Sequence, residues 1–267
     1  MEKIHSAPHL KSVPYFLLKS TQKAFSILEI LCDAGKMSVS ELAKRTNLRK
    51  SNVHRLLATL TYLGYVEQDP ATYKYFPSLK TFEIGSAIVN RLGLQPIVHP
   101  FLEGLGKQFH ETNNLAVLDR GEVIYIDKVE SSESLRMDIK VGRRVPAYCT
   151  ALGKVLLAHL SESEIEEFLE HQKLIPCTTR TVTSPKELRR TLAQIRAQGY
   201  AIDEEEFSEG IRCIATSIQN HNGKVIAAIS IAGPSIRMND DKLAQLKEPL
   251  INAAKEVSKK LGYQNRD

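Results

Sequence analysis

Residues 38–66 constrain the fold most, because their apolar spacing indicates a helix, a short turn and a second helix. In the second helix, apolar side chains recur at intervals of three and four residues, which predicts one buried face. These residues are Val53, Leu56, Leu57, Leu60 and Leu63. The other face and the helix start carry hydroxyl, amide and cationic groups, on Arg49, Lys50, Ser51, Asn52, Arg55 and Thr59. A helix anchored by one face and polar on the other suits the major groove of DNA.

The residues around this helix pair predict where its helices begin and end. Ser38 and Glu41 have the spacing of a capping box, which begins the first helix at Val39. Gly64 follows the second helix, where a residue of positive φ ends a helix well. Ser20 is placed to cap a third, preceding helix. The segment therefore predicts three helices in succession.

A short hairpin is expected directly after these helices. The turn sequence at 69–72 separates two strand-like runs, at 65–68 and 73–76. Three helices followed by a two-stranded wing make a winged helix-turn-helix. Within the wing, we expect Lys74 to contact the DNA backbone or the minor groove.

The distribution of charge favours DNA binding over a structural role for this unit. Residues 1–95 carry 13 Lys and Arg against 7 Asp and Glu, a net charge of +6. Residues 96–267 carry 23 Lys and Arg against 24 Asp and Glu, so the positive surplus of the whole chain, +5, lies in the first segment. Neutralising DNA phosphates requires such a surplus. A helix-turn-helix used only for assembly remains the alternative, since apolar spacing by itself shows only that a helix packs.

Composition and cysteine spacing favour a cytoplasmic protein of two domains. At 267 residues the chain is long enough for two cores. It has no apolar run of the ~20 residues that span a bilayer and no hydrophobic signal region at residues 1–19, so no membrane partner is expected. The four cysteines lie far apart, without the spacing of a zinc site or a disulfide framework. They are Cys32, Cys149, Cys177 and Cys213.

Downstream of the wing, the pattern changes to a helix and then to mixed strands and helices. Residues 79–92 predict a helix that either pairs with its counterpart in a second subunit or packs within its own domain. Further on, an Asn-Gly hairpin signal at 222–223 joins two strands. Strands are predicted at 115–118, 123–129, 135–141, 211–219 and 225–232, and helices at 150–159, 162–170, 185–198 and 240–261. This predicts an α+β domain with an antiparallel sheet that encloses a pocket.

With these residues in place, the chain resembles the IclR family of bacterial transcriptional regulators over nearly its whole length. The matching stretches are LRKSNVHRLLATLTYLGYV at 48–66, GRRVPAYCTALGKVLLA at 142–158, GYAID at 199–203, GIRCIATS at 210–217 and IAAISIAGP at 226–234. The resemblance implies a winged helix-turn-helix at 15–78, a linker helix at 79–95 and a GAF-like effector domain at 96–264. It also implies a homodimer or homotetramer on a palindromic operator near catabolic genes.

The resemblance further implies a pocket for a small organic acid, between the loop before the Gly153 helix and the last strands. The matching positions are Met137, Ala151, Leu152, Asp203, Ile211, Cys213, Ser230 and Ala232. The start of the helix at 150–159 is by itself suited to a carboxylate, because its backbone N–H groups point outward at a positive dipole end. Residues 134–158 are similar to relatives that control sugar-acid catabolism, so we expect a sugar acid or a short keto acid. Ala232 stands where some relatives have a second serine, which removes one polar contact.

An enzyme is the rival class, and the sequence gives it little support. His110 and Glu111 begin a metalloprotease pattern, but Asn114 stands where the second histidine belongs. Cys149 precedes a helix N-terminus, which can lower the pKa of a thiol, yet it has no His-plus-acid partner. We therefore expect no catalytic residue, no cofactor and no metal. The sequence predicts a transcriptional regulator, more a repressor than an activator, against a sensor or enzyme whose helix-turn-helix serves only for assembly.

Overall fold

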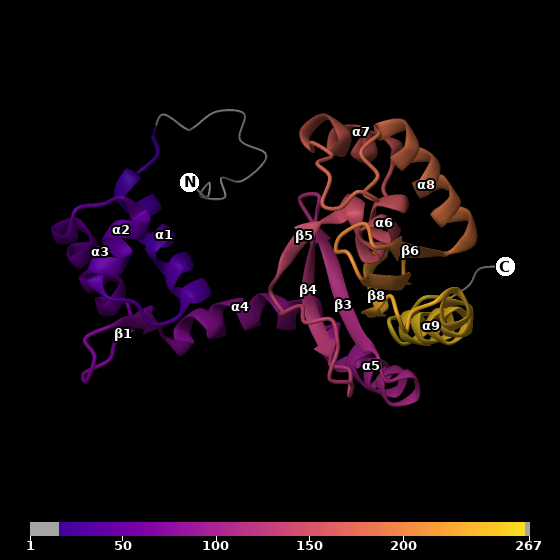
Figure 1. Cartoon of the computed structure of the whole chain (residues 1–267), viewed down its shortest axis with the longest axis horizontal. Helices are drawn as coiled ribbons and strands as arrows, with labels where there is room; N and C mark the ends of the chain where they lie inside the picture. Colours follow the sequence, from indigo (N-terminus) through magenta and orange to yellow (C-terminus); the bar gives the residue numbers. More distant parts are fainter. Residues whose placement is uncertain (1–15, 265–267) are drawn as a thin grey trace. The chain divides into compact units, whose positions relative to one another are not determined.

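The first unit of the computed structural model, which describes residues 16–264, ends at Leu92 (Figure 1). Its elements are α1 (Lys19–Ala34), α2 (Val39–Thr46), α3 (Lys50–Tyr62), β1 (Val66–Gln68), β2 (Tyr75–Pro77) and α4 (Leu79–Leu92). Helices α1 to α3 and the two strands share one small apolar core, made of Ile27, Leu28, Leu31, Leu42, Val53, Leu57, Leu60, Val66 and Tyr75. The predicted winged helix-turn-helix is confirmed. Residue 15, where we placed its start, lies outside the described residues.

The helix caps of this unit are mostly those that the sequence predicts. The Ser38 side chain accepts a hydrogen bond from the Glu41 backbone, and the Glu41 side chain accepts one from the Ser38 backbone. The prediction for Ser20 is wrong. Helix α1 begins two residues earlier than that cap requires, at Lys19, and its N-cap is Leu18 without a side-chain bond. Ser20 therefore already lies within the first turn and does not occupy the capping position.

The wing is a short antiparallel hairpin. Val66 lies opposite Pro77 and Gln68 opposite Tyr75. Each strand is shorter by one residue than predicted, because β1 begins at Val66 and the turn extends to residue 74 before β2. An isolated bridge between Met37 and Tyr75 joins the second strand to the loop before α2. The hairpin is thereby fixed to the helices that precede it.

Helix α4 follows the wing and has no buried residue in the single chain. Its exposed apolar residues are Leu79, Phe82, Ile84, Ile88 and Leu92. Removing apolar surface of such side chains from water is favourable by roughly 25 cal/mol per Å² of buried area. The described part of the first unit does not provide this cover.

The second unit begins at Gly93 and is an α+β fold. Its elements are α5 (Gln95–Phe109), β3 (Thr112–Asp119), β4 (Glu122–Val129), β5 (Arg144–Pro146), η1 (Ala147–Cys149), α6 (Ala151–Ala158), α7 (Glu162–His171), α8 (Pro185–Gln198), β6 (Tyr200–Glu204), β7 (Ile211–Gln219), β8 (Val225–Pro234) and α9 (Asp240–Lys260). The strands form one antiparallel sheet in the order β5-β4-β3-β8-β7-β6. Helices α5 and α9 cover one face, and α6 with α7 and α8 covers the other (Figure 1).

The sequence predicts most of these elements but is wrong about one strand and misses two others. The Asn-Gly hairpin between β7 and β8 is confirmed, with Gly223 at φ 74°. Residues 135–141 form no strand, although their apolar side chains alternate as predicted. Met137 and Ile139 are buried under the sheet edge, while the edge of β4 pairs with β5 instead. The sequence analysis does not predict β5, at 144–146, or β6, at 200–204. None of the helices of residues 16–264 combines the length and apolar character that crossing a bilayer requires.

Candidate DNA-binding face and ligand cavity

Helix α3 is held to its unit by one face, which leaves the other face free. Val53, Leu57 and Leu60 are buried and Leu56 is half-buried, whereas Leu63, beyond the helix end, is exposed. The polar residues predicted for the opposite face are exposed: Arg49, Lys50, Ser51, Asn52, Arg55 and Thr59. The orientation needed for groove binding is therefore present.

The exposed face of α3 also has side chains that are not engaged elsewhere. Within residues 16–264, Arg49, Lys50 and Arg55 form no ion pair or side-chain hydrogen bond. The first turn of the helix has no acidic residue, so nothing there opposes its positive dipole end. Thr59 differs, because its hydroxyl donates a hydrogen bond to the Arg55 carbonyl at 3.0 Å. Charge and unpaired donors thus gather at the N-terminal end, as phosphate binding requires.

The wing places Lys74 beside α2. Its Nζ lies 3.6 Å from Glu41 Oε1, and the lysine side chain stays partly exposed. The pair lies near the surface, where it is screened and weak, so Lys74 is able to exchange Glu41 for a phosphate. Next to it, Tyr73 is 72% exposed and has φ 55°. Sequence reasoning missed this tyrosine, since nothing in the pattern indicates a positive φ at a tyrosine.

An ion pair fixes the turn of the wing. Lys36 donates a hydrogen bond to Asp69 at 2.5 Å, and Asp69 also accepts the backbone N–H groups of Ala71 and Thr72. These contacts, the bond from Lys36 foremost, lower the pKa of Asp69 to about 2. The carboxylate is therefore charged at neutral pH and holds the turn in one conformation.

The second unit contains a small closed cavity between the sheet and the start of α6. Its volume of about 10 Å³ is close to the lower limit for one water molecule. Its wall is formed by Asn114, Tyr125, Met137, Thr150, Ala151, Leu152, Asp203, Phe207, Ser208, Ile211, Cys213 and Ser230. None of these residues is a lysine, an arginine or a histidine.

The wall includes seven of the eight positions that the sequence predicts for an effector. Ala232 is the exception: it is fully buried on β8 opposite Cys213, and its short side chain does not reach the cavity. The residues that sequence reasoning missed come from β3, β4, the cap of α6 and the turn after β6. They are Asn114, Tyr125, Thr150, Phe207 and Ser208.

The first turn of α6 presents backbone donors to this cavity. The Thr150 hydroxyl caps the helix by accepting from the Gly153 N–H at 3.0 Å. Ala151 and Leu152 lie in the wall at a point where backbone N–H groups have no acceptor within their own helix. Gly153 makes this arrangement possible, because a Cβ there would clash with the backbone carbonyl of Ala147. The first turn of α6 thus approaches η1 closely at Gly153, next to the two wall residues Ala151 and Leu152.

A polar pair lies on the sheet side of the cavity. Asn114 on β3 faces Ser230 on β8, and its Nδ2 donates to the Ser230 Oγ at 3.3 Å. The Asn114 Oδ1 is buried and has no hydrogen-bond partner among the described residues. A buried acceptor without a partner costs stability, commonly 1–3 kcal/mol. It is therefore a free acceptor in the cavity wall, suited to a hydrogen-bond donor.

Asp203 is the acidic residue in the cavity wall. Burial raises its pKa to about 7, against the opposing effects of the Lys154 ammonium and the Glu206 N–H, which donates to Asp203 Oδ1 at 2.7 Å. Near neutral pH the carboxyl group is therefore present in both its protonated and its charged form. In its protonated form it donates a hydrogen bond, and in its charged form it only accepts them.

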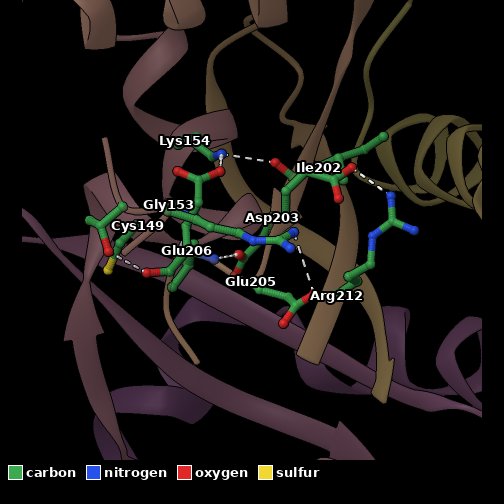
Figure 2. A network of polar contacts seen from close by, with 12 residues as sticks. Cys149, Gly153, Lys154, Ile202, Asp203, Glu205, Glu206 and Arg212 are labelled. Atoms are coloured by element: carbon green, nitrogen blue, oxygen red, sulfur yellow. Dashed lines mark hydrogen bonds and ion pairs between the residues drawn. The ribbon is translucent and has the colours of Figure 1, made fainter. Parts of the chain in front are cut away.

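A buried ion pair stands behind Asp203 (Figure 2). Lys154 on α6 donates to the Glu206 carboxylate and, at 2.8 Å, to the Ile202 carbonyl. The second carboxylate oxygen of Glu206 is buried without a partner among the described residues. The pair connects α6 to the turn after β6, which carries two further wall residues.

Cys149, just before α6, does not have the reactive thiol that its position at a helix N-terminus suggests. Burial, followed by the Cys177 sulfur, raises the pKa of the Cys149 thiol, although a helix N-terminus follows it. Burial likewise raises the pKa of Cys213 and of Tyr125. The lowering of the Cys149 pKa that a helix N-terminus can cause is therefore outweighed, because desolvation is the larger effect.

Comparison with known proteins finds the same relatives for both units. A family model described as the IclR helix-turn-helix domain matches residues 20–70. A second model, described as Bacterial transcriptional regulator IclR C-terminal, matches residues 86–259. The HTH-type transcriptional regulator KdgR of Escherichia coli (strain K12) is 38% identical over 246 residues, which cover 92% of this chain and 94% of that protein.

Solved structures agree over a similar length. The Thermotoga maritima IclR has 37% sequence identity and a TM-score of 0.79, with 92% of this chain and 99% of that one covered. An IclR homologue from Microbacterium hydrocarbonoxydans, solved in complex with 4-hydroxybenzoate, has 26% identity and a TM-score of 0.79. The match covers 91% of this chain and 98% of that one. The similarity includes the helix-turn-helix and the antiparallel sheet domain alike.

Proposed function

Because this chain belongs to the IclR family of bacterial transcriptional regulators, we propose that it represses catabolic genes under the control of a small organic acid. Its relatives are DNA-binding regulators and not enzymes. The finer proposal has three parts: which residues contact the operator, which acid binds, and how two copies assemble. Repression needs only that the bound protein occupies DNA required by RNA polymerase. The chromosomal operator implies action in the cytoplasm.

The operator contacts are assigned to the exposed face of α3 and to the wing. Ser51 and Arg55 are placed for base edges, and Thr59 follows them one turn further along the helix. Arg49, Lys50 and Asn52 surround the helix start, where phosphates are bound most readily. Lys74 contacts the backbone or minor groove from the wing. The observation that carries this proposal is that the cations of α3 are exposed and unpaired among the described residues.

The effector is assigned to the cavity of the second unit. Its carboxylate accepts the N–H groups of Ala151 and Leu152, and its hydroxyl or keto groups meet Asp203 and Ser230. Met137, Ile211 and Cys213 supply apolar contact, with Ala232 behind them. The homologue complexed with 4-hydroxybenzoate, itself a hydroxylated organic acid, supports this class of ligand. A sugar acid or short keto acid is larger than the closed cavity of about 10 Å³, so binding opens it.

Opening of the cavity gives the effector its influence on DNA. A ligand shifts a two-state equilibrium only by as much as it prefers one state. We propose that two copies of the chain pair through the exposed apolar residues of α4 and present two recognition helices to a palindromic operator. The open cavity favours a spacing of those helices that differs from the one the operator requires. A dimer or a pair of dimers satisfies this scheme.

Selection of DNA from a random pool by the full-length protein, followed by gel shift at increasing salt, tests the function. We expect a palindromic consensus and an affinity that falls at least tenfold between 50 and 200 mM salt, because several phosphates are contacted. Pyruvate and D-galacturonate, as a keto acid and a sugar acid, are then added to the complex. Salt-independent or sequence-independent binding would favour the assembly alternative, and activation of a reporter gene would contradict repression.

A further inference from the structure

Two cysteines of the second unit lie side by side beneath the ligand cavity. Cys149 in η1 is buried, and Cys177 in the segment after α7 is exposed. Their Sγ atoms are 3.6 Å apart. A disulfide has an S–S length of about 2.05 Å, so the sulfurs must approach by roughly 1.6 Å. Residues 172–184 between α7 and α8 form neither helix nor strand, so this approach does not require a helix or strand to move on the Cys177 side.

We propose that Cys149 and Cys177 form a disulfide when the protein meets a peroxide, and that this bond holds the ligand cavity closed. The Cys177 thiol first reduces hydrogen peroxide, which gives a sulfenic acid and one water. The Cys149 sulfur then attacks the Cys177 sulfur, the S–O bond breaks, and the leaving hydroxyl takes the Cys149 proton as a second water. Two thiols and one peroxide are thus converted to one disulfide and two waters.

The different surroundings of the two thiols fix the order of these steps. Cys177 is exposed and is reached by the oxidant, whereas Cys149 is buried in the core, where its thiol donates to the Pro146 carbonyl at 3.5 Å. Burial raises the pKa of the Cys149 thiol, which suits a resolving thiol better than a first nucleophile.

The segment that carries Cys177 is hydrogen-bonded to the turn after β6, which contributes to the cavity wall. The Thr181 hydroxyl donates to the Glu206 carbonyl at 2.6 Å, and the Thr178 hydroxyl donates to the Glu205 carbonyl at 2.7 Å. The next two residues of the same turn, Phe207 and Ser208, form part of the cavity wall. Movement of the segment 172–184 is therefore transmitted to the wall.

Cys149 is attached to the opposite wall. It directly precedes Thr150, Ala151 and Leu152, all of which line the cavity. The neighbouring Tyr148 hydroxyl donates to the Ile175 carbonyl at 2.7 Å and accepts from the Ile175 N–H at 3.0 Å. A bond between the sulfurs would thus tie the start of α6 to the turn after β6. This inference about regulation rests on the proposed function, but the formation of the bond does not.

The chemistry is tested on full-length protein carrying Cys32→Ser, which leaves three thiols. After one equivalent of hydrogen peroxide and denaturation, alkylation should count one thiol instead of three. Peptide mass spectrometry should find Cys149 joined to Cys177, with two hydrogens lost, and dithiothreitol should restore both thiols. The control with Cys32→Ser and Cys177→Ser has two thiols and should keep both. Oxidation of Cys177 to sulfinic or sulfonic acid beside an intact Cys149 thiol would overturn the proposal.

The closing effect is tested by amide hydrogen exchange on the same oxidised and reduced samples. We expect exchange in residues 204–208 to slow at least tenfold on oxidation and to recover with dithiothreitol. The measurement needs neither DNA nor effector, so its failure differs from a failure of the proposed function. A disulfide that forms without slowing exchange there would overturn the proposed hold on the cavity.

Discussion

Lys154 on α6 donates a hydrogen bond to Glu206 in the turn after β6, and the two side chains are only 3% and 8% exposed. A charge enclosed in this way depends on its partner, because water does not replace the lost contact. The pair joins two walls of the ligand cavity that are far apart in the sequence. Its integrity therefore bears on both the stability of the second unit and the shape of the cavity.

Replacing Lys154 alone should be strongly destabilising. We expect Lys154→Met to lower the free energy of unfolding by about 3–5 kcal/mol, since Glu206 is left as an uncompensated buried charge. The double variant Lys154→Met with Glu206→Leu should regain most of that loss. Urea denaturation measures both. Arg189→Ala is the control, because it removes an exposed ion pair with Glu166 that contributes about 0–1 kcal/mol. If the single and double variants lose the same free energy of unfolding, the loss comes from packing and not from an uncompensated charge.

Local signals of the chain predict the caps and hairpins well. The Ser38–Glu41 capping box and the Asn-Gly turn of β7 and β8 depend on residues within a few positions of each other. The failed strand at 135–141 has the correct alternation, but whether a run becomes a strand depends on which edge is free to pair with it. Here β4 pairs with β5 instead.

The cavity depends on contacts that no spacing in the sequence reveals. Asn114 and Ser230 are 116 positions apart, and Lys154 and Glu206 are 52 apart. The predicted wall residues came from the family resemblance rather than from periodicity. Of the residues it missed, Asn114 and Tyr125 lie on buried strands, whereas Thr150, Phe207 and Ser208 lie at a helix cap and in a turn. No local pattern marks any of them as part of a cavity. The face of α3 was predictable because a helix has a single fixed period.

Replacing Asp203 should change how stability depends on pH. Its pKa of about 7 in the folded protein lies above the ordinary value of 3.8, so the folded state binds the proton more tightly. The stability from this group is therefore full below pH 3.8 and is lost as pH rises through 7. Across this range, the free energy of unfolding of the wild type should fall by up to ~1.4 kcal/mol per pH unit relative to that of Asp203→Asn. Denaturation of both proteins at pH 5 and pH 8 measures the difference, and parallel curves would place the group's pKa near its ordinary value.

Adding a methyl group at Gly153 should disrupt the start of α6. The Cβ of Gly153→Ala would overlap the Ala147 backbone, so either η1 or α6 must move, at a cost of about 1–3 kcal/mol or more. Gly104→Ala is the matched control, because Gly104 lies in α5 with open space around its Cβ position. That control should be neutral or more stable by about 0.5–1 kcal/mol. Thermal unfolding distinguishes them, and an unperturbed Gly153→Ala protein would contradict the close approach.

Two substitutions on α3 should affect DNA binding in different ways. Arg55→Ala should cost about 1–3 kcal/mol at the selected operator and relax the preference for one base pair. Lys50→Ala should weaken binding equally on all sequences and reduce the salt slope by about 1. Gel shift on the selected operator and on single-base variants measures both effects. Unchanged operator affinity in Arg55→Ala would remove that residue from the interface, and an unchanged salt slope in Lys50→Ala would do the same for Lys50.

A charge on α4 should weaken the assembly of two copies. Ile84, Ile88 and Leu92 recur every four residues, which places them on one face, and all three are exposed. A stable protein interface needs roughly 1,000 Å² or more of buried surface, so a carboxylate within this face should be costly. We expect Ile88→Glu to shift the protein toward monomer in sedimentation velocity and to weaken binding to a palindromic operator more than to a half-site. Glu83→Gln, which changes charge elsewhere on the helix, should preserve the assembly. An Ile88→Glu protein that sediments as wild type would place the contact between copies on another surface.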